Sequence, residues 1–158
     1  GGALSPTPGF ESVSNEIISM QPLSDTPMAT GYEFKRVTPT KFFKLKSMNY
    51  AHHIIELQSS KAWPIYVDHE NIVIDSSIFA VGIVLGERVI FAKHDYQLPS
   101  VSRQVLLDRC LDGSITHEPI TRMDLASADA VIGCNAVNSV FVVNQQITGI
   151  DFTKYQIF

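Results

Sequence analysis

Four short stretches of the chain carry side chains that could do chemistry together. Lys46 stands in Leu-Lys-Ser-Met-Asn-Tyr (45–50), directly after an apolar lead-in. Asp75 ends an apolar run and precedes two serines. Further on come Pro-Ser-Val-Ser-Arg (99–103) and Gly-Cys-Asn-Ala (133–136). In this order the chain supplies an amine, a carboxylate, a helix start and a small polar turn.

An amine and a carboxylate in this arrangement suit a cofactor with an aldehyde and an aromatic nitrogen, as in pyridoxal phosphate. Partial burial and a nearby cation favour the neutral, nucleophilic form of a lysine such as Lys46. A carboxylate such as Asp75 holds the proton of the ring nitrogen by a charge-assisted hydrogen bond, which strengthens the ring as an electron sink. Taken singly, Lys46 could equally be a surface lysine at a helix start, and Asp75 an ordinary turn aspartate.

The phosphate of such a cofactor needs backbone amides at the N-terminus of a helix, where the helix dipole also favours an anion. The amides of Val101 and Ser102 and the Ser102 hydroxyl follow Ser100, a candidate N-cap. Asn135, in the small-residue turn, could add a side-chain donor. Taken alone, residues 99–103 are explained better by simple helix capping. The four stretches therefore indicate the cofactor jointly.

The elements that must position these residues are predicted from apolar periodicity. Residues 1–15, rich in Gly, Pro and Ser, are expected to be loop or chain end. Strands are expected at 16–23, 32–37, 65–68, 72–74, 79–85, 88–92, 115–120, 131–132 and 137–143. Helices are expected at 47–62, 101–111 and 122–128, the second with an apolar face of Val101, Val105, Leu106 and Cys110. Tight turns are expected at 68–71 and 133–136.

Composition excludes several classes of protein. The chain has 158 residues and a net charge of -4, without a basic stripe for nucleic acid. The longest apolar runs, 78–85 and 137–143, are far shorter than the ~20 residues of a membrane span. The N-terminus lacks the basic start and long apolar stretch of a signal peptide. This size predicts one domain, or one domain with a remnant of another.

Cysteine and histidine spacing gives no reason to expect a metal. Cys110 and Cys134 form neither a disulfide framework nor a metal-binding pair of motifs. His52 and His53 are adjacent in a predicted helix, so their side chains point to different sides. The composition is typical of a reducing, cytoplasmic setting.

Taken in order, these segments resemble the large domain of the fold-type IV pyridoxal phosphate enzymes. Lys-Ser-Met-Asn from Lys46 is similar to the family's Lys-Ser-Leu-Asn, whose lysine forms the Schiff base, and Tyr50 falls where some members carry a tyrosine near the phenolic oxygen. DHENIVIDSS (68–77) is similar to a hairpin ending in Thr-Glu-Gly-Ser, whose Glu meets the pyridine nitrogen. LPSVSRQ (98–104) resembles the phosphate turn Leu-Pro-Gly-Ile-Thr-Arg.

The resemblance implies a fold and a domain division. It covers about residues 17–151, and VIGCNAVNSVFVV (131–143) is most similar to the Ile-Cys-Asn-Ala-Leu string of aminodeoxychorismate lyases. The implied fold is α+β, with mixed strands wrapped by helices. Residues 38–158 would form the large, cofactor-binding domain, and residues 1–37 a remnant of the small domain with the interdomain linker. Family members pair as homodimers, so a homodimer is expected.

The activity implied first is that of aminodeoxychorismate lyase, which forms para-aminobenzoate and pyruvate for folate synthesis. Lys46 would hold the cofactor and move the proton, Asp75 would face the ring nitrogen, and Val101, Ser102 and Asn135 would bind phosphate. An aminotransferase of the branched-chain or D-amino-acid type is the alternative on the same scaffold, also with a small amino substrate.

A non-catalytic, truncated domain is a third reading of the sequence. Three departures from the family pattern motivate it. The acid is Asp75 rather than Glu, Ala80 stands where many members have Asn, and the family's phosphate-binding arginine is expected upstream of Gly1.

Overall fold

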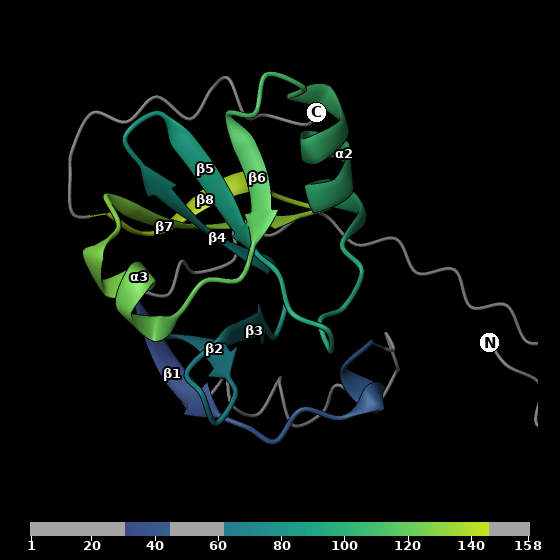
Figure 1. Cartoon of the computed structure of the whole chain (residues 1–158), viewed down its shortest axis with the longest axis vertical. Helices are drawn as coiled ribbons and strands as arrows, with labels where there is room; N and C mark the ends of the chain where they lie inside the picture. The colour runs from purple at the N-terminus through teal and green to yellow at the C-terminus, as the bar shows by residue number, and fades with distance from the viewer. Residues whose placement is uncertain (1–30, 45–61, 146–158) are drawn as a thin grey trace, which may run out of the picture.

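The strands form two sheets in a computed structural model, which describes residues 31–44 and 62–145 (Figure 1). The first sheet has the order β1-β2-β3, with β1 at Tyr32–Arg36, β2 at Trp63–Val67 and β3 at Val73–Ser76. β1 and β2 are parallel, whereas β2 and β3 are antiparallel. The expectations for residues 1–15, for the strand at 16–23 and for the helix at 47–62 (save Ala62) concern segments outside the described residues.

The second sheet has five strands in the order β6-β5-β4-β7-β8. Their bounds are β4 Ala80–Leu85, β5 Arg88–Ala92, β6 Ile115–Glu118, β7 Ala130–Asn135 and β8 Ser139–Gln145. β5 and β6 are parallel, and the other neighbours are antiparallel. With both parallel and antiparallel pairs in each sheet, the predicted mixture of strand directions is confirmed.

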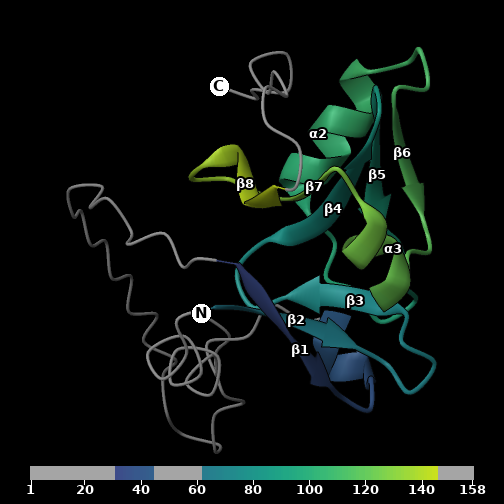
Figure 2. The ribbon, with the colours of Figure 1, turned by 90° about the vertical axis from the view of Figure 1, so that its left-hand side faces the viewer.

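Three short helical elements complete the described part of the chain: the 3-10 helix η1 (Lys41–Lys44), α2 (Val101–Arg109) and α3 (Arg122–Ser127). α2 packs against β7 and β6 on one side of the five-stranded sheet (Figures 1 and 2). The three-stranded sheet lies on the other side. The Val73 amide donates to the Ile120 carbonyl at 2.9 Å, so β3 is tied to the segment before α3.

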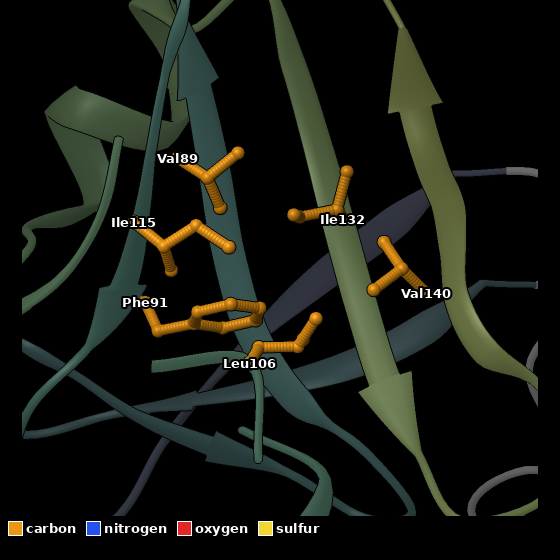
Figure 3. A pocket seen from close by; sticks show the side chains of 6 residues that line it. All are labelled: Val89, Phe91, Leu106, Ile115, Ile132 and Val140. Carbon is orange, nitrogen blue, oxygen red and sulfur yellow. The ribbon is translucent and has the colours of Figure 1, made fainter. Parts of the chain in front are cut away.

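The apolar core has two parts, one on each face of the five-stranded sheet. Along β4, Val81 and Ile83 belong to the part shared with the three-stranded sheet, whereas Ala80 and Val84 face α2. This alternation follows from the pleat, which turns successive side chains to opposite faces. Figure 3 shows the α2 side, where six apolar side chains from four strands and the helix converge: Val89, Phe91, Leu106, Ile115, Ile132 and Val140.

Local turn and cap chemistry is confirmed where it was predicted. The Asp68 carboxylate accepts from the amides of Glu70 and Ile72 at 2.8 and 2.9 Å and closes the turn at 68–71. Asn71 completes that turn with a φ of 64°. Thr121 caps α3 through a capping box with Asp124.

Two predictions about the elements near the site were wrong. The helix face predicted to be apolar begins with Val101, but Val101 is 77% exposed, and Ser102 and Arg103 are buried in its place. The first turn of α2 faces polar groups of the site, and the helix meets the apolar core only from Val105 and Leu106 onward.

The turn predicted at 133–136 was also wrong, because β7 continues through Gly133 and Cys134 to Asn135. A strand can hold this glycine because two rings close over it. A Cβ at Gly133 would lie 2.6 Å from Phe141 and 2.7 Å from Phe79.

No helix in the described residues is long and apolar enough to cross a membrane. β1 lies within residues 1–37, the predicted small-domain remnant and linker, and pairs along its length with β2. The division between 37 and 38 stays a prediction.

Candidate functional site

The structure brings Asp75, the first turn of α2 and the end of β7 together. The Leu98 amide, in the loop that enters α2, donates to the Asp75 carboxylate. Two residues further along, the Ser100 side chain hydrogen-bonds with the Cys134 thiol of β7. Three of the four stretches predicted to cooperate lie in the described residues, and these three are neighbours. Lys46 and Tyr50 lie outside the described residues.

Asp75 is held at the end of β3 by its neighbours on both sides. Ile74 is fully buried and anchors the strand, and the Ser76 hydroxyl donates to the Pro64 carbonyl of β2 at 2.8 Å. The Ser76 amide donates to the Asp75 carboxylate at 3.0 Å. With the strand fixed on either side, the Asp75 carboxylate is directed to the side of the sheet from which Leu98 approaches.

The electrostatic state of Asp75 is unusual for a carboxyl group. Burial raises its pKa to about 7, although the hydrogen bonds from Ser76 and Leu98 and the charge of Arg103 act to lower it. Near pH 7 the folded chain therefore holds this carboxyl only about half ionised. A protonated nitrogen beside it would favour the carboxylate.

The start of α2 offers backbone amides for which no acceptor is found among residues 31–44 and 62–145. Ser100 is the N-cap, and its hydroxyl oxygen accepts from the Arg103 amide at 3.3 Å. The Ser100 carbonyl accepts from the Gln104 amide at 3.0 Å. The amides of Val101 and Ser102 precede the first bond of the helix and have no intrahelical acceptor. They are the backbone donors that an anion would meet here.

Asn135 forms the turn between β7 and β8. Its side-chain oxygen accepts from the amides of Val137 and Asn138 at 3.0 and 2.8 Å. Its amide nitrogen donates to the Ile78 carbonyl at 3.4 Å, next to the loop that follows Asp75. The oxygen is thus engaged by the turn, and the amide group is the part that could face a phosphate.

Sequence reasoning missed a buried polar group beside these residues. Arg103 is only 7% exposed, and its Nη1 has no hydrogen-bond partner among the described residues.

The His117 Nε2 lies 3.0 Å from the Ala92 carbonyl and 3.2 Å from Oε1 of Gln97. Both neighbours are acceptors, so Nε2 carries the proton. Burial, and secondarily the charge of Arg103, lower the pKa of His117 and favour its neutral form.

The sequence held one signal for Arg103 that was not used. Arg103 stands three positions after the N-cap residue, and the N-cap side chain accepts from a backbone amide at this position. Arg103 therefore belongs to the helix turn that faces the site. A charged residue on the inward side of a short helix marks a polar environment. For His117 and Gln97 no comparable local signal exists, because their meeting depends on the pairing of β5 with β6.

The arrangement defines a class of protein: an α+β domain whose strand-end carboxylate faces a helix N-terminus. The family model described as amino-transferase class IV matches residues 11–145. The chain belongs to this family, whose members are pyridoxal phosphate enzymes of fold type IV. No curated protein matches the chain.

Solved structures show the same fold at low sequence identity. The 4-amino-4-deoxychorismate lyase from Pseudomonas aeruginosa is 18% identical, with a TM-score of 0.68 over 87% of this chain and 58% of that one. A hypothetical aminotransferase from Mycobacterium tuberculosis, with alpha-ketoglutarate and PMP bound, is 13% identical, with a TM-score of 0.64 over 73% and 46%. The branched-chain aminotransferase from Thermoproteus uzoniensis is 17% identical, with a TM-score of 0.60 over 77% and 48%. The chain spans about half the length of these structures.

Proposed function

We propose that the chain is the cofactor-binding part of a pyridoxal phosphate enzyme, and that its activity is that of an aminodeoxychorismate lyase. The substrate would be 4-amino-4-deoxychorismate, and the products para-aminobenzoate and pyruvate. The observation that most supports pyridoxal phosphate as the cofactor is the position of the Asp75 carboxylate beside the first turn of α2. The lyase is favoured by the Cys-Asn-Ala string at 134–136 and by the likeness to the Pseudomonas aeruginosa enzyme.

The residues present fit this cofactor. A carboxyl group with a pKa of about 7 is suited to a protonated ring nitrogen, because that proton offsets the burial of the carboxylate. The free amides of Val101 and Ser102 suit a phosphate, with the amide group of Asn135 as a further donor. When bound, pyridoxal phosphate supplies an electron sink for the bond that breaks beside the substrate amine.

The chain's own groups would bind the cofactor and move protons. Lys46 would hold the cofactor aldehyde through its Nζ and would carry a proton to and from the substrate. Asp75 keeps the ring nitrogen protonated. Tyr50 would contact the phenolic oxygen. We expect the reaction to take place in the cytoplasm and the chain to form a homodimer, which sedimentation can measure.

The aminotransferase alternative uses the same residues but needs a 2-oxo acid to take up the amino group. The branched-chain enzyme among the similar structures favours it. The two activities are separated by one assay. A lyase releases pyruvate from 4-amino-4-deoxychorismate without an acceptor, whereas an aminotransferase turns over amino acids only when a 2-oxo acid is added.

A test of the proposal begins with cofactor attachment. The purified chain is mixed with pyridoxal phosphate, scanned for absorbance, reduced with borohydride and mapped by peptide mass. Label confined to Lys46, and absent from Lys46→Ala, supports the proposal. Lys44→Ala is the matched control, because Lys44 is an exposed lysine two positions away. No label, or label scattered over other lysines, contradicts the proposal and favours the non-catalytic reading suggested by Asp75 and Ala80.

A further inference from the structure

The entry loop, residues 93–100, leads from β5 into α2. It extends toward the three-stranded sheet before it returns to the helix (Figure 1). Its first half folds into a tight turn, in which the Gln97 amide donates to the His94 carbonyl at 3.1 Å. Its last residue, Ser100, caps α2. The course of this loop therefore decides where the first turn of α2 lies.

His94, in the turn of the entry loop, has both ring nitrogens engaged. Its Nδ1 accepts from the Tyr96 amide at 3.1 Å, so the proton of the neutral imidazole is on Nε2. Nε2 lies 3.5 Å from Oδ2 of Asp68, which makes a long hydrogen bond. The side chains of His94 and Asp68 are only 11% and 8% exposed, so water competes little for this contact.

Asp68 presents one carboxylate oxygen to the loop because the other is already held. Its Oδ1 accepts from the amides of Glu70 and Ile72, which fixes the orientation of the carboxylate. Burial acts to raise the pKa of Asp68, but the hydrogen bonds from Ile72, Glu70 and His94 lower it below its ordinary value. At neutral pH His94 therefore meets a fixed, negatively charged acceptor.

The hairpin of β2 and β3 meets the entry loop at two places. Asp68, in the turn of the hairpin, contacts His94, and Asp75, near the far end of β3, accepts from the Leu98 amide. Two contacts four residues apart fix the loop along the hairpin. The position of the α2 cap relative to Asp75 therefore depends on the contact between His94 and Asp68.

We propose that His94 is a positioning residue of the cofactor site, which through Asp68 sets the spacing between the Asp75 carboxylate and the first turn of α2. This rests on the proposed function. The ring nitrogen and the phosphate of pyridoxal phosphate lie at a nearly fixed separation, so the groups that meet them must match it to within about 0.5 Å. His94 itself does not touch the cofactor. Its loss should reduce the gain from meeting both ends of the cofactor at once.

The test compares pyridoxal phosphate with pyridoxal, which has the same ring and aldehyde but lacks the phosphate. The ratio of their dissociation constants, from absorbance titration, reports how well the phosphate is met while the ring is bound. In His94→Asn the side-chain oxygen can still accept from the Tyr96 amide, but the donor to Asp68 is lost. The preference for pyridoxal phosphate should fall about fivefold, as expected for one hydrogen bond.

Two further variants serve as rescue and control. His94→Gln places an amide donor near the position of Nε2 and should retain most of the preference. His69→Asn is the matched control, because His69 is an exposed histidine in the same turn as Asp68, and it should leave the preference unchanged. An unchanged preference in a folded His94→Asn chain would overturn the proposal, as would an equal fall in His94→Gln or in His69→Asn.

If His94→Asn does not fold, as judged by circular dichroism, Asp68→Asn breaks the same contact from the other side. It keeps the oxygen that accepts from the two turn amides and should show the same fall in preference. If neither variant folds, the contact is required for folding and not for the site in particular, and the proposal is overturned.

Hydrogen exchange in the cofactor-free chain separates this proposal from the proposed function. The Leu98 amide should exchange about fivefold faster in His94→Asn and at its usual rate in His69→Asn. Faster exchange, in a chain that binds neither pyridoxal phosphate nor pyridoxal, would contradict the proposed function and leave the role of His94 in the loop supported. Unchanged exchange would overturn the role of His94 even where pyridoxal phosphate labels Lys46.

Discussion

The Ser100 hydroxyl and the Cys134 thiol are hydrogen-bonded, which holds the cap of α2 against the end of β7. The same hydroxyl oxygen accepts from the Arg103 amide at 3.3 Å. Ser100 therefore joins the two sides of the proposed phosphate site. Because burial raises the pKa of Cys134 to about 12, its thiol stays protonated and serves the structure instead of acting as a nucleophile.

Ser100→Ala should weaken both the helix and the site. Loss of an N-cap costs about 1 kcal/mol of the free energy of unfolding, and the contact with Cys134 is lost as well. Thr121→Ala is the matched control, because it removes the cap of α3 away from the site. Denaturant unfolding should show a similar loss of stability for both variants, and absorbance titration should show weaker pyridoxal phosphate binding for Ser100→Ala alone. Equal cofactor affinity in the two variants would contradict the joining role of Ser100.

Asp75→Asn should change how the stability of the cofactor-free chain depends on pH. The ordinary pKa of an aspartate is 3.8 and that of folded Asp75 about 7. Between these values the folded chain keeps a proton that the unfolded chain has lost, so the Asp75 contribution to stability falls as pH rises through this window. An asparagine removes that dependence. The melting temperature of the variant relative to the unaltered chain should therefore be higher at about pH 8 than at about pH 5. A constant difference would show that Asp75 ionises normally.

In the presence of cofactor the same variant should retain attachment to Lys46 but lose most of its turnover. Its side chain no longer offers the ring nitrogen an anionic partner, so the electron sink is weaker. Asp75→Glu keeps the charge and should retain more activity. Borohydride labelling and the pyruvate assay measure the two steps separately. Full activity in Asp75→Asn would remove Asp75 from the mechanism.

Asn135→Asp separates the turn role of this residue from its proposed phosphate role. An aspartate keeps the oxygen that accepts from the amides of Val137 and Asn138 but loses the donor to the Ile78 carbonyl, so the turn should lose only part of its stability. It replaces a donor with a negative charge, which should repel the phosphate. Cofactor affinity should therefore fall more than the melting temperature does. Asn135→Ala should instead lower the melting temperature, because two backbone donors lose their acceptor. Unchanged cofactor affinity in Asn135→Asp would mean that Asn135 acts only in the turn and does not bind the phosphate.

Much of this fold could be predicted because its signals are local. The turn that follows β2 is fixed by the Asp68 side chain and by Asn71, and α3 begins where Thr121 and Asp124 stand three residues apart. Such features depend on a few consecutive residues and elementary hydrogen bonding. The order of the four chemical stretches was enough to indicate the family, and the three described stretches lie near the ends of β3 and β7 and at the start of α2.

What could not be predicted depends on contacts between distant segments. Gly133 and Cys134 are typical turn residues by composition, yet they lie within β7 because they pair with β4 and β8, and Phe79 and Phe141 close over the glycine. Arg103 is buried although it is charged, and its pKa is raised by Asp75, which lies far from it in the sequence, in β3. Neither relationship produces a periodic pattern that could be recognised in a single sequence.

Gly133→Ala should destabilise the chain by displacing these rings. A new Cβ would lie 2.6 Å from Phe141 and 2.7 Å from Phe79, and overpacking of this kind costs about 1–3 kcal/mol. Phe79 also packs edge-on against Trp63, with ring centroids 5.6 Å apart, so a displaced ring would disturb the contact between the two sheets. Denaturant unfolding measures the loss.

Two comparisons identify the cause of this loss. Gly82→Ala, whose nearest contact would be 2.9 Å from Phe91, should cost less than Gly133→Ala. Adding Phe141→Leu to Gly133→Ala removes the ring atom that the new methyl group meets, so the double variant should recover part of the lost stability, and the two substitutions should be non-additive. Additive losses would mean that Gly133 is required for its backbone and not for the space beneath the two rings.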